Sequence, residues 1–237
     1  AAALMAAKRK SFFIAGTDTD VGKTVVTCAM LAAAVKAGYS AVGMKPLAAG
    51  AQLTTDGLRN NDALQIMRSG SIALSYDEVN PVCLQEAASP HIAAKLSGRM
   101  VRIERLAGFC QGVLARRADL TLIEGVGGWR APVNDRETMA DLAKKLQLPV
   151  ILVVGMRLGC LNHALLTLEA IVRDNLQVAG WVANRMDPGL QYYEQNRDYL
   201  LRELEMFPLL AELPYLSSPL QPEQAAQYFV LDQLLQS

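Results

Sequence analysis

The chain has 237 residues, of which 51% are hydrophobic and 19% are charged, and this composition excludes an intrinsically disordered protein. Its 23 basic residues equal its 23 acidic residues, so the sequence offers no strong electrostatic attraction for nucleic acid or for an anionic membrane. No apolar run reaches the ~20 residues of a membrane span. The four cysteines are scattered, which predicts reduced thiols in a cytoplasmic protein.

The N-terminal segment, residues 1–10, reads AAALMAAKRK. Its basic residues follow the small ones, which is the reverse of the order in a signal peptide. We therefore expect this segment to be a remnant of cloning or a disordered N-terminus. The remainder, 11–237, shows no repeat, low-complexity tract or Pro/Gly-rich linker, which predicts a single domain.

Short apolar strand patterns alternate with longer helical patterns along the chain. The sequence predicts strands over 11–15, 41–45, 120–124, 149–155, 178–184 and 209–213. It predicts helices over 23–37, 137–147, 161–174, 190–205 and 221–236, with loops and short helices between 46 and 120. Strands that are apolar throughout are buried on both faces, as in parallel sheets. The alternation therefore predicts an α/β fold with a doubly wound, mostly parallel sheet.

A glycine loop, GTDTDVGKT over residues 16–24, joins the first predicted strand to the first predicted helix. This strand–loop–helix context is what a phosphate-binding loop (P-loop) requires. Lys23 would lie along the β- and γ-phosphates of a nucleoside triphosphate, and Thr24 would place its hydroxyl on Mg²⁺. Five residues separate Gly16 from Gly22, whereas the common motif has four. The alternative is an ordinary tight turn with an exposed lysine.

Three further charged residues stand at the ends of predicted elements. Glu124 ends an apolar strand and opens a glycine loop, where a carboxylate can hold Mg²⁺; the alternative is a helix-capping or turn carboxylate. Lys45 ends a strand at the edge where parallel sheets bind ligands, which suits an anionic substrate or a transferring phosphoryl group. A solvated lysine is the alternative there. Asp62 precedes a helical pattern and is either a second carboxylate near the metal or a helix N-cap.

Taken in order, these segments resemble the dethiobiotin synthetases. The resemblance covers nearly all of residues 11–216 and includes the additional residue of the phosphate loop. Besides the loop and the pair Lys45-Pro46, the matching segments are 57–60 with Asp62, 79–81, 89–91, 124–129, 148–151, 159–163, 180–184 and 213–216.

The resemblance implies a homodimeric enzyme that uses ATP and Mg²⁺, acts on small molecules, and has neither a nucleic-acid nor a membrane partner. In the reaction of this family, 7,8-diaminopelargonic acid takes up CO₂ as a carbamate on one amine. The carbamate attacks the γ-phosphate of ATP to give a carbamic–phosphoric anhydride and ADP. The second amine then closes the ring of dethiobiotin, a precursor of biotin, as phosphate leaves.

The resemblance also implies roles for individual residues. Lys23 and Lys45 would be catalytic, stabilising the γ-phosphate and the carbamate. The ligands of Mg²⁺ would be Thr24, Asp62 and Glu124. Substrate contacts would come from Thr19, Lys45, Ala49 and, across the dimer, Asn162. Nucleotide contacts would come from Asp20, Val21, Gly22, Lys23, Thr24, Asp62, Glu124, Gly125, Val126, Gly127, Asn184, Arg185, Pro214, Tyr215 and Leu216.

Some positions and some other protein classes leave alternatives open. Ala49 stands where many relatives carry a serine, so one hydroxyl contact to substrate is missing. The tyrosine that reaches substrate across the dimer is either Tyr192 or Tyr193. The cobyrinic and cobyric acid synthetases share this type of nucleotide domain, but they also need a glutaminase domain, which we do not expect within 237 residues. Partitioning and septum-positioning ATPases carry a lysine after the first glycine of the loop, where this chain has Thr17.

Overall fold

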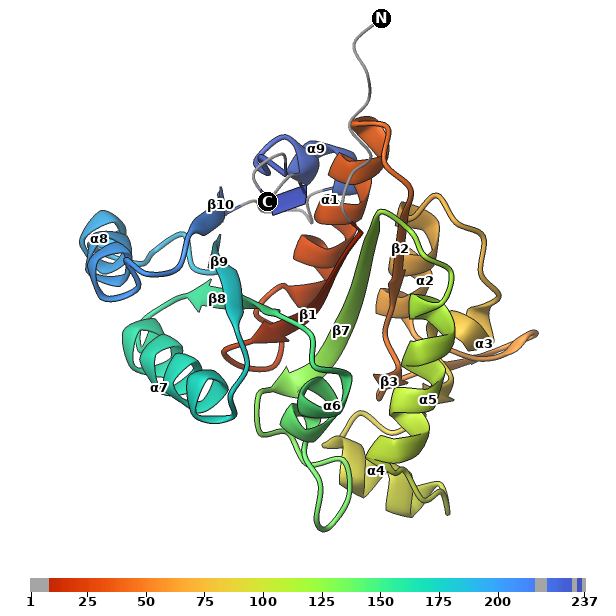
Figure 1. Ribbon diagram of the computed structural model, residues 1–237. Coiled ribbons are helices and arrows are strands. Elements are labelled where there is room, and N and C mark those ends of the chain that lie inside the picture. The colour runs from red at the N-terminus through yellow and green to blue at the C-terminus, as the bar shows by residue number, and fades with distance from the viewer. Residues whose placement is uncertain (1–8, 216–220, 232–233, 236–237) are drawn as a thin grey trace, which may run out of the picture.

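The structure is a computed structural model that describes residues 9–215, 221–231 and 234–235. Its centre is a six-stranded sheet in the order β10-β9-β8-β1-β7-β2, in which all neighbouring strands are parallel (Figure 1). The strands are β1 (Lys10–Gly16), β2 (Ala41–Met44), β7 (Leu120–Gly128), β8 (Val150–Met156), β9 (Val178–Arg185) and β10 (Leu209–Leu213). The predicted strands are all present, and the predicted fold class is confirmed.

Strand β1 begins one residue earlier than predicted, at Lys10. Residues 1–8 of the expected N-terminal segment lie outside the described residues. Lys10, however, is already part of β1, because it pairs with Leu120 of β7 and its backbone N–H donates to the carbonyl of Asp119 at 2.9 Å.

Helices cover both faces of the sheet, as expected for strands that are apolar on both sides. One face carries α1 (Lys23–Lys36), α2 (Asn61–Ser69), α3 (Tyr76–Val79) and α9 (Pro222–Ala226). The other carries α4 (Pro90–Leu96), α5 (Ile103–Leu114), α6 (Met139–Leu146), α7 (Cys160–Arg173) and α8 (Tyr193–Glu203) (Figure 1). Phe12 of β1 packs on the first face and Phe13 on the second, since successive strand residues point to opposite sides. None of the helices that the structure describes has the length and apolar character needed to cross a membrane.

The region between β2 and β7 is irregular, as predicted. Two short strands, β3 (Leu47–Ala48) and β6 (Val82–Cys83), pair in parallel, and β4 (Gln52–Thr54) forms an antiparallel pair with β5 (Gly57–Arg59). Only Asn60 separates the end of β5 from the start of α2.

The helix predicted over 221–236 is shorter than expected. The α9 helix ends at Ala226, and a turn follows at residues 227 and 228. Phe229 and Leu231 are buried against the same core as α1, whereas Val230 between them is 70% exposed. This alternation has the period of an extended chain and not of a helix, so burial of these two side chains overrides the local helical pattern.

A buried polar contact joins α1 to β7. Thr27 is fully buried, and its hydroxyl lies 2.7 Å from Oε2 of Glu124 and 2.9 Å from the carbonyl oxygen of Lys23. The hydroxyl has one proton and donates to one of these acceptors at a time. Because Glu124 is only 1% exposed, its carboxylate depends on such donors in place of water.

We predict that Thr27→Val, which keeps the shape of the side chain but removes the hydroxyl, lowers the free energy of unfolding by about 1–3 kcal/mol, because it deprives a buried carboxylate of a donor. Urea denaturation measures this. Thr167→Val in α7 is the matched control, since the Thr167 hydroxyl donates to the carbonyl of His163 at 2.7 Å, four residues earlier, as Thr27 does with Lys23. Equal destabilisation by the two substitutions would contradict the role given to Glu124.

Candidate functional site

The phosphate loop lies at the centre of the sheet, between the carboxyl end of β1 and the start of α1 (Figure 1). From β1 the chain crosses in one direction to β2, and from β7 it crosses in the other direction to β8. The strand order therefore reverses beside β1. Open parallel sheets bind ligands at this kind of switch point, outside the carboxyl ends of the strands.

The backbone of the loop requires glycine at Gly22. Its φ is 96°, and a Cβ there would lie 2.1 Å from Nδ2 of Asn184. That Nδ2 donates to the carbonyl of Val21 at 2.8 Å, so the end of β9 supports the loop directly. The Lys23 ammonium donates to the carbonyl of Asp18 at 3.0 Å. Burial lowers the pKa of Lys23 from its ordinary value.

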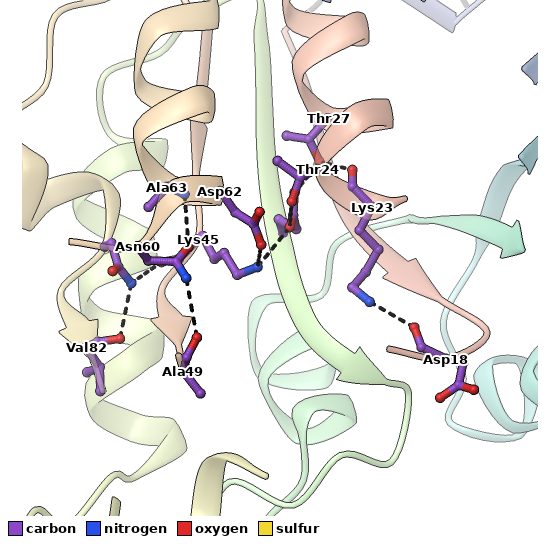
Figure 2. A network of polar contacts seen from close by, with 12 residues as sticks. Asp18, Lys23, Thr24, Thr27, Lys45, Ala49, Asn60, Asp62, Ala63 and Val82 are labelled. Atoms are coloured by element: carbon purple, nitrogen blue, oxygen red, sulfur yellow. Dashed lines mark hydrogen bonds and ion pairs between the residues drawn. The ribbon is translucent and has the colours of Figure 1, made fainter. Parts of the chain in front are cut away.

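A network of charged and polar side chains lies beside the loop and consists of Lys45, Asp62, Glu124 and Thr24. Figure 2 shows the Lys45 side chain extending from the end of β2 toward Asp62. Nζ of Lys45 lies 2.6 Å from Oδ2 of Asp62 and 3.3 Å from Oε1 of Glu124. The Thr24 hydroxyl donates to the same Oε1 at 2.7 Å. Burial alone would lower the pKa of Lys45, but the carboxylates of Glu124 and Asp62 outweigh it and raise that pKa. Lys45 is thus a buried cation and not the solvated lysine of the alternative.

Asp62 is free for a role in the site because another residue caps α2. Oδ1 of Asn60 accepts from the backbone N–H of Ala63 at 3.1 Å, which makes Asn60 the N-cap. Asp62 stands in the first turn and points toward Lys45 (Figure 2). The alternative in which Asp62 caps the helix is therefore wrong.

The oxygen donors of this network suit Mg²⁺ bound together with phosphates. Thr24, Asp62 and Glu124 all line one cleft, and Thr24 and Glu124 are in direct contact. Within the described residues, no cluster of three His, Cys, Asp or Glu side chains forms a cage for a metal. In nucleotide sites Mg²⁺ is held by one or two carboxylates together with phosphate oxygens and water, so two carboxylates and a threonine hydroxyl fit it.

The cleft has a volume of about 850 Å³ and combines a charged floor with a wall of small apolar residues. Eleven of the predicted site residues line it, namely Thr19, Asp20, Gly22, Lys23, Thr24, Lys45, Ala49, Asp62, Glu124, Val126 and Gly127. A smaller cavity of about 210 Å³ lies at the start of α5 and shares no residue with this cleft. The phosphate loop and the charged network place the candidate site in the larger one.

Other predicted residues lie outside the cleft. Gly125 faces Phe13 on the side of the sheet away from the loop, and Arg185 stacks on the ring of Tyr193 at 4.6 Å. Asn162 is exposed on α7. Val21 is a buried residue of the loop itself, and Asn184 supports the loop from β9. Pro214 and Tyr215 follow β10, and Leu216 lies outside the described residues.

The two candidate tyrosines differ in exposure. Tyr193 is 5% exposed and packs in the core under α8, whereas Tyr192 is 69% exposed at the start of that helix. Of the two, Tyr192 is the one whose side chain lies on the surface, where a second subunit could meet it.

The sequence reasoning missed most of the apolar wall. Its residues are Ala87, Ala88, Pro90, Ala131 and Pro132, with the polar Ser89 among them. Ser89 and Pro90 belonged to a matching segment but received no role. Small apolar residues in loops carry no local signal of a binding site, so the alanines could not be recognised from the sequence.

Proteins that share the fold of this chain differ from those that share its sequence. Residues 10–223 match the model of a family described as AAA domain. The structure resembles a ParA family ATPase from Chlorobium tepidum TLS, with a TM-score of 0.56 and 10% identity over 93% of this chain and 98% of that chain. It also resembles a chain of the MinC:MinD cell division protein complex of Aquifex aeolicus, with a TM-score of 0.54 and 13% identity over 94% and 88% of the two chains. At such identities, the likeness establishes the P-loop fold alone.

Similarity in sequence is much closer to another group. The ATP-dependent dethiobiotin synthetase BioD of Cellvibrio japonicus (strain Ueda107) is 52% identical over 209 residues, which are 88% of this chain and 91% of that protein. The proteins of the same name from Marinobacter nauticus and Vibrio vulnificus (strain YJ016) are 49% and 45% identical, over 89% and 96% of this chain and 90% and 99% of their own lengths. The chain therefore belongs to the ATP-dependent dethiobiotin synthetases, a family of P-loop ligases.

Proposed function

We propose that this protein carboxylates 7,8-diaminopelargonic acid with CO₂ and closes the ring of dethiobiotin at the expense of ATP, with Mg²⁺. One observation carries the proposal: residues of the phosphate loop and the ion-paired Lys45 line the same cleft, beside a wall of small apolar residues. Membership of the dethiobiotin synthetase family supports the choice of this reaction among those a P-loop site can perform.

The strand order suggests how the nucleotide lies. Asn184 and Arg185 end β9 and Pro214 follows β10, on one side of β1, whereas β7 and β2 lie on the other. The base would therefore lie toward β9 and β10, where Tyr215 and Leu216 would complete its contacts. The phosphates would lie over the loop from Asp20 to Thr24 and the γ-phosphate would point toward Lys45. The backbone N–H groups at the start of α1 and the Lys23 ammonium would bind the phosphate oxygens.

Charge placement is the main catalytic task in this reaction. A carbamate is a weak anionic nucleophile, and its attack on the γ-phosphate brings two anions together. Lys23 and Lys45 would reduce this repulsion and stabilise the charge that develops on the phosphoryl oxygens. Mg²⁺, when bound by Thr24, Asp62 and Glu124, would neutralise phosphate charge. Asp62 and Glu124 would also hold the Lys45 ammonium in the cleft, where it can meet the carbamate.

The apolar wall suits the rest of the substrate. Ala87, Ala88 and Ala131 offer small apolar surfaces along which a methylene chain can lie. Thr19 and Ala49 line the same cleft and would contact the diamine end. Excluding water on this side would also protect the mixed anhydride from hydrolysis.

A homodimer would complete the site through α7. Asn162 and Leu166 are both exposed and stand one turn apart on this helix, and Leu158, just before it, is 89% exposed. An apolar helix face of this kind is stabilised when a second copy covers it. Asn162 would then lie in the interface, from which its amide can reach the carboxylate of the diamine in the partner's cleft. Tyr192 is a second exposed residue available for that contact.

Incubating the protein with the diamine, bicarbonate, Mg²⁺ and ATP should yield dethiobiotin and ADP in equal amounts. We predict that Lys23→Ala lowers kcat by at least about 100-fold, because one of the two cations at the phosphoryl group is lost. Lys36→Ala, an exposed lysine in the last turn of the same helix, should leave kcat unchanged. No dethiobiotin at any diamine concentration would refute the proposed reaction, and a near-normal rate in Lys23→Ala would refute the role of the loop.

Ala49 gives a second test, directed at the substrate. We predict that Ala49→Ser lowers the KM for the diamine about five-fold, because the added hydroxyl can hydrogen-bond a charged or polar group of the substrate. The KM for ATP is the internal control and should not change. An unchanged diamine KM would show that residue 49 makes no contact with the diamine.

Mixed dimers test whether Asn162 acts in the partner's site. Lys23→Ala and Asn162→Ala homodimers should each be nearly inactive. After the two variants are dissociated and reassembled together, activity should return to roughly a quarter of the wild-type value, because half of the dimers are mixed and each mixed dimer has one intact site. Activity no greater than the average of the two homodimers would place Asn162 in the site of its own subunit or outside any site.

A further inference from the structure

The hydroxyl of Tyr76, in α3, joins two polar side chains inside the protein. Tyr76 is buried, and its hydroxyl accepts from the backbone N–H of Asn60 at 2.7 Å and donates to Oδ1 of Asn80 at 2.8 Å. Neither Tyr76 nor Asn80 lines the cleft. Their hydrogen bonds nevertheless lead, by two routes, to the charged pair Lys45 and Asp62.

The first route passes through Asn80 to the backbone of Lys45. Nδ2 of Asn80 donates to the carbonyl of Lys45 at 2.8 Å and to the carbonyl of Val82 at 3.1 Å. The N–H of Lys45 donates to the carbonyl of Val79 at 2.9 Å. Both backbone polar groups of Lys45 are thus held by the segment 79–80, at the point where the chain leaves β2 and the side chain enters the cleft.

The second route passes through Asn60 to the start of α2. Asn60 caps this helix through its bond from Ala63, and Asp62 stands in the first turn. Nδ2 of Asn60 also donates to the carbonyl of Ala49 at 3.3 Å (Figure 2). The position of Asn60 therefore fixes the direction from which Asp62 approaches Lys45. It also fixes the position of the Ala49 backbone, on the proposed substrate side of the cleft.

We propose that Tyr76 and Asn80 are positioning residues that hold the Lys45 ammonium and the Asp62 carboxylate at their working separation. The proposal rests on the proposed function of the cleft, because Lys45 and Asp62 matter most when a carbamate and a γ-phosphate meet there. Both side chains are anchored to one buried hydroxyl, so loss of that hydroxyl loosens both anchors together. Displacements of about 1 Å at such groups can lower rates by about 100-fold.

The hydrogen bonds of Tyr76, Asn80 and Asn60 make no contact with the phosphate loop. The loop is held by Asn184 and by the Thr24 and Thr27 contacts to Glu124, none of which involves Tyr76 or Asn80. A positioning defect on the Lys45 side should therefore appear mainly in kcat and in the diamine KM, while the KM for ATP changes little, because the loop, Thr24 and Glu124 keep their contacts even when Asp62 shifts. A general loss of stability would not separate these constants.

Two substitutions test the network. Tyr76→Phe removes only the hydroxyl. Asn80→Asp keeps the outline of the side chain but places an oxygen against two carbonyl oxygens. The matched control is Ser40→Ala, because the Ser40 hydroxyl also donates to a side chain, Oδ2 of Asp119 at 2.8 Å, and accepts a backbone N–H, that of Asp119 at 2.9 Å. Ser40 lies just before β2, at the end of the sheet opposite the cleft.

We expect Tyr76→Phe and Asn80→Asp each to lower kcat at least about ten-fold, with the KM for ATP within about two-fold of the wild type. Ser40→Ala should lower the melting temperature and leave kcat unchanged. A second readout does not depend on the reaction: reductive methylation of lysine amines, followed by mass spectrometry. Lys45 is 6% exposed and should be labelled several-fold faster in both variants, whereas Lys23, equally buried in the same cleft, should keep its rate.

The outcomes separate the two proposals. If the wild type makes no dethiobiotin, the proposed function fails, and the labelling of Lys45 alone decides the positioning role. Wild-type kcat together with unchanged Lys45 labelling in both variants would overturn that role. So would a loss of kcat in Ser40→Ala equal to that in Tyr76→Phe, because activity would then follow stability. Should Tyr76→Phe not fold, Asn80→Asp gives the same comparison.

Discussion

The buried carboxylate of Glu124 is the constraint on which the rest of the site depends. A carboxylate that is 1% exposed must find donors inside the protein, and here they come from Thr24 and Thr27 of α1 and from Lys45 at the end of β2. Satisfying one charge thus fixes a helix and two strands relative to one another. Lys45 extends the constraint to α2 through Asp62. The groups that stabilise this fold are the same groups that we propose bind the phosphates and their metal.

The cleft consists of two halves with separate supports. The phosphate half is a backbone structure, made by the loop from Gly16 to Thr24 and braced from β9 by Asn184. The half that we propose for the substrate is built mainly from side chains between β2 and β7, with Ala131 and Pro132 from beyond β7, and is braced by the Tyr76 hydroxyl. This division has a physical reason. Phosphate binding uses backbone N–H groups that any P-loop supplies, whereas recognition of a particular acceptor needs side chains whose positions only a specific tertiary network can hold.

The same division accounts for the two kinds of relative. A ParA family ATPase shares the fold at 10% identity, so the fold by itself does not specify a reaction. The dethiobiotin synthetases match instead at 45–52% identity over most of their length. Function therefore lies in what is built on the fold and not in the fold itself.

The sequence by itself determined the six strands, the phosphate loop, and the strand-end positions of Lys45 and Glu124, because each is a local pattern of apolar runs, glycines and charges. It also carried enough ordered motifs to indicate the family. The tertiary structure alone decided that Lys45 pairs with both carboxylates, that Asn60 and not Asp62 caps α2, and that the helix from 222 stops at Ala226. Only the fold joined Tyr76 to the site and gathered the alanines into a wall. The contacts of Glu124 span 79 to 100 residues along the chain, and no local pattern records which distant groups will meet when a buried charge has to be satisfied.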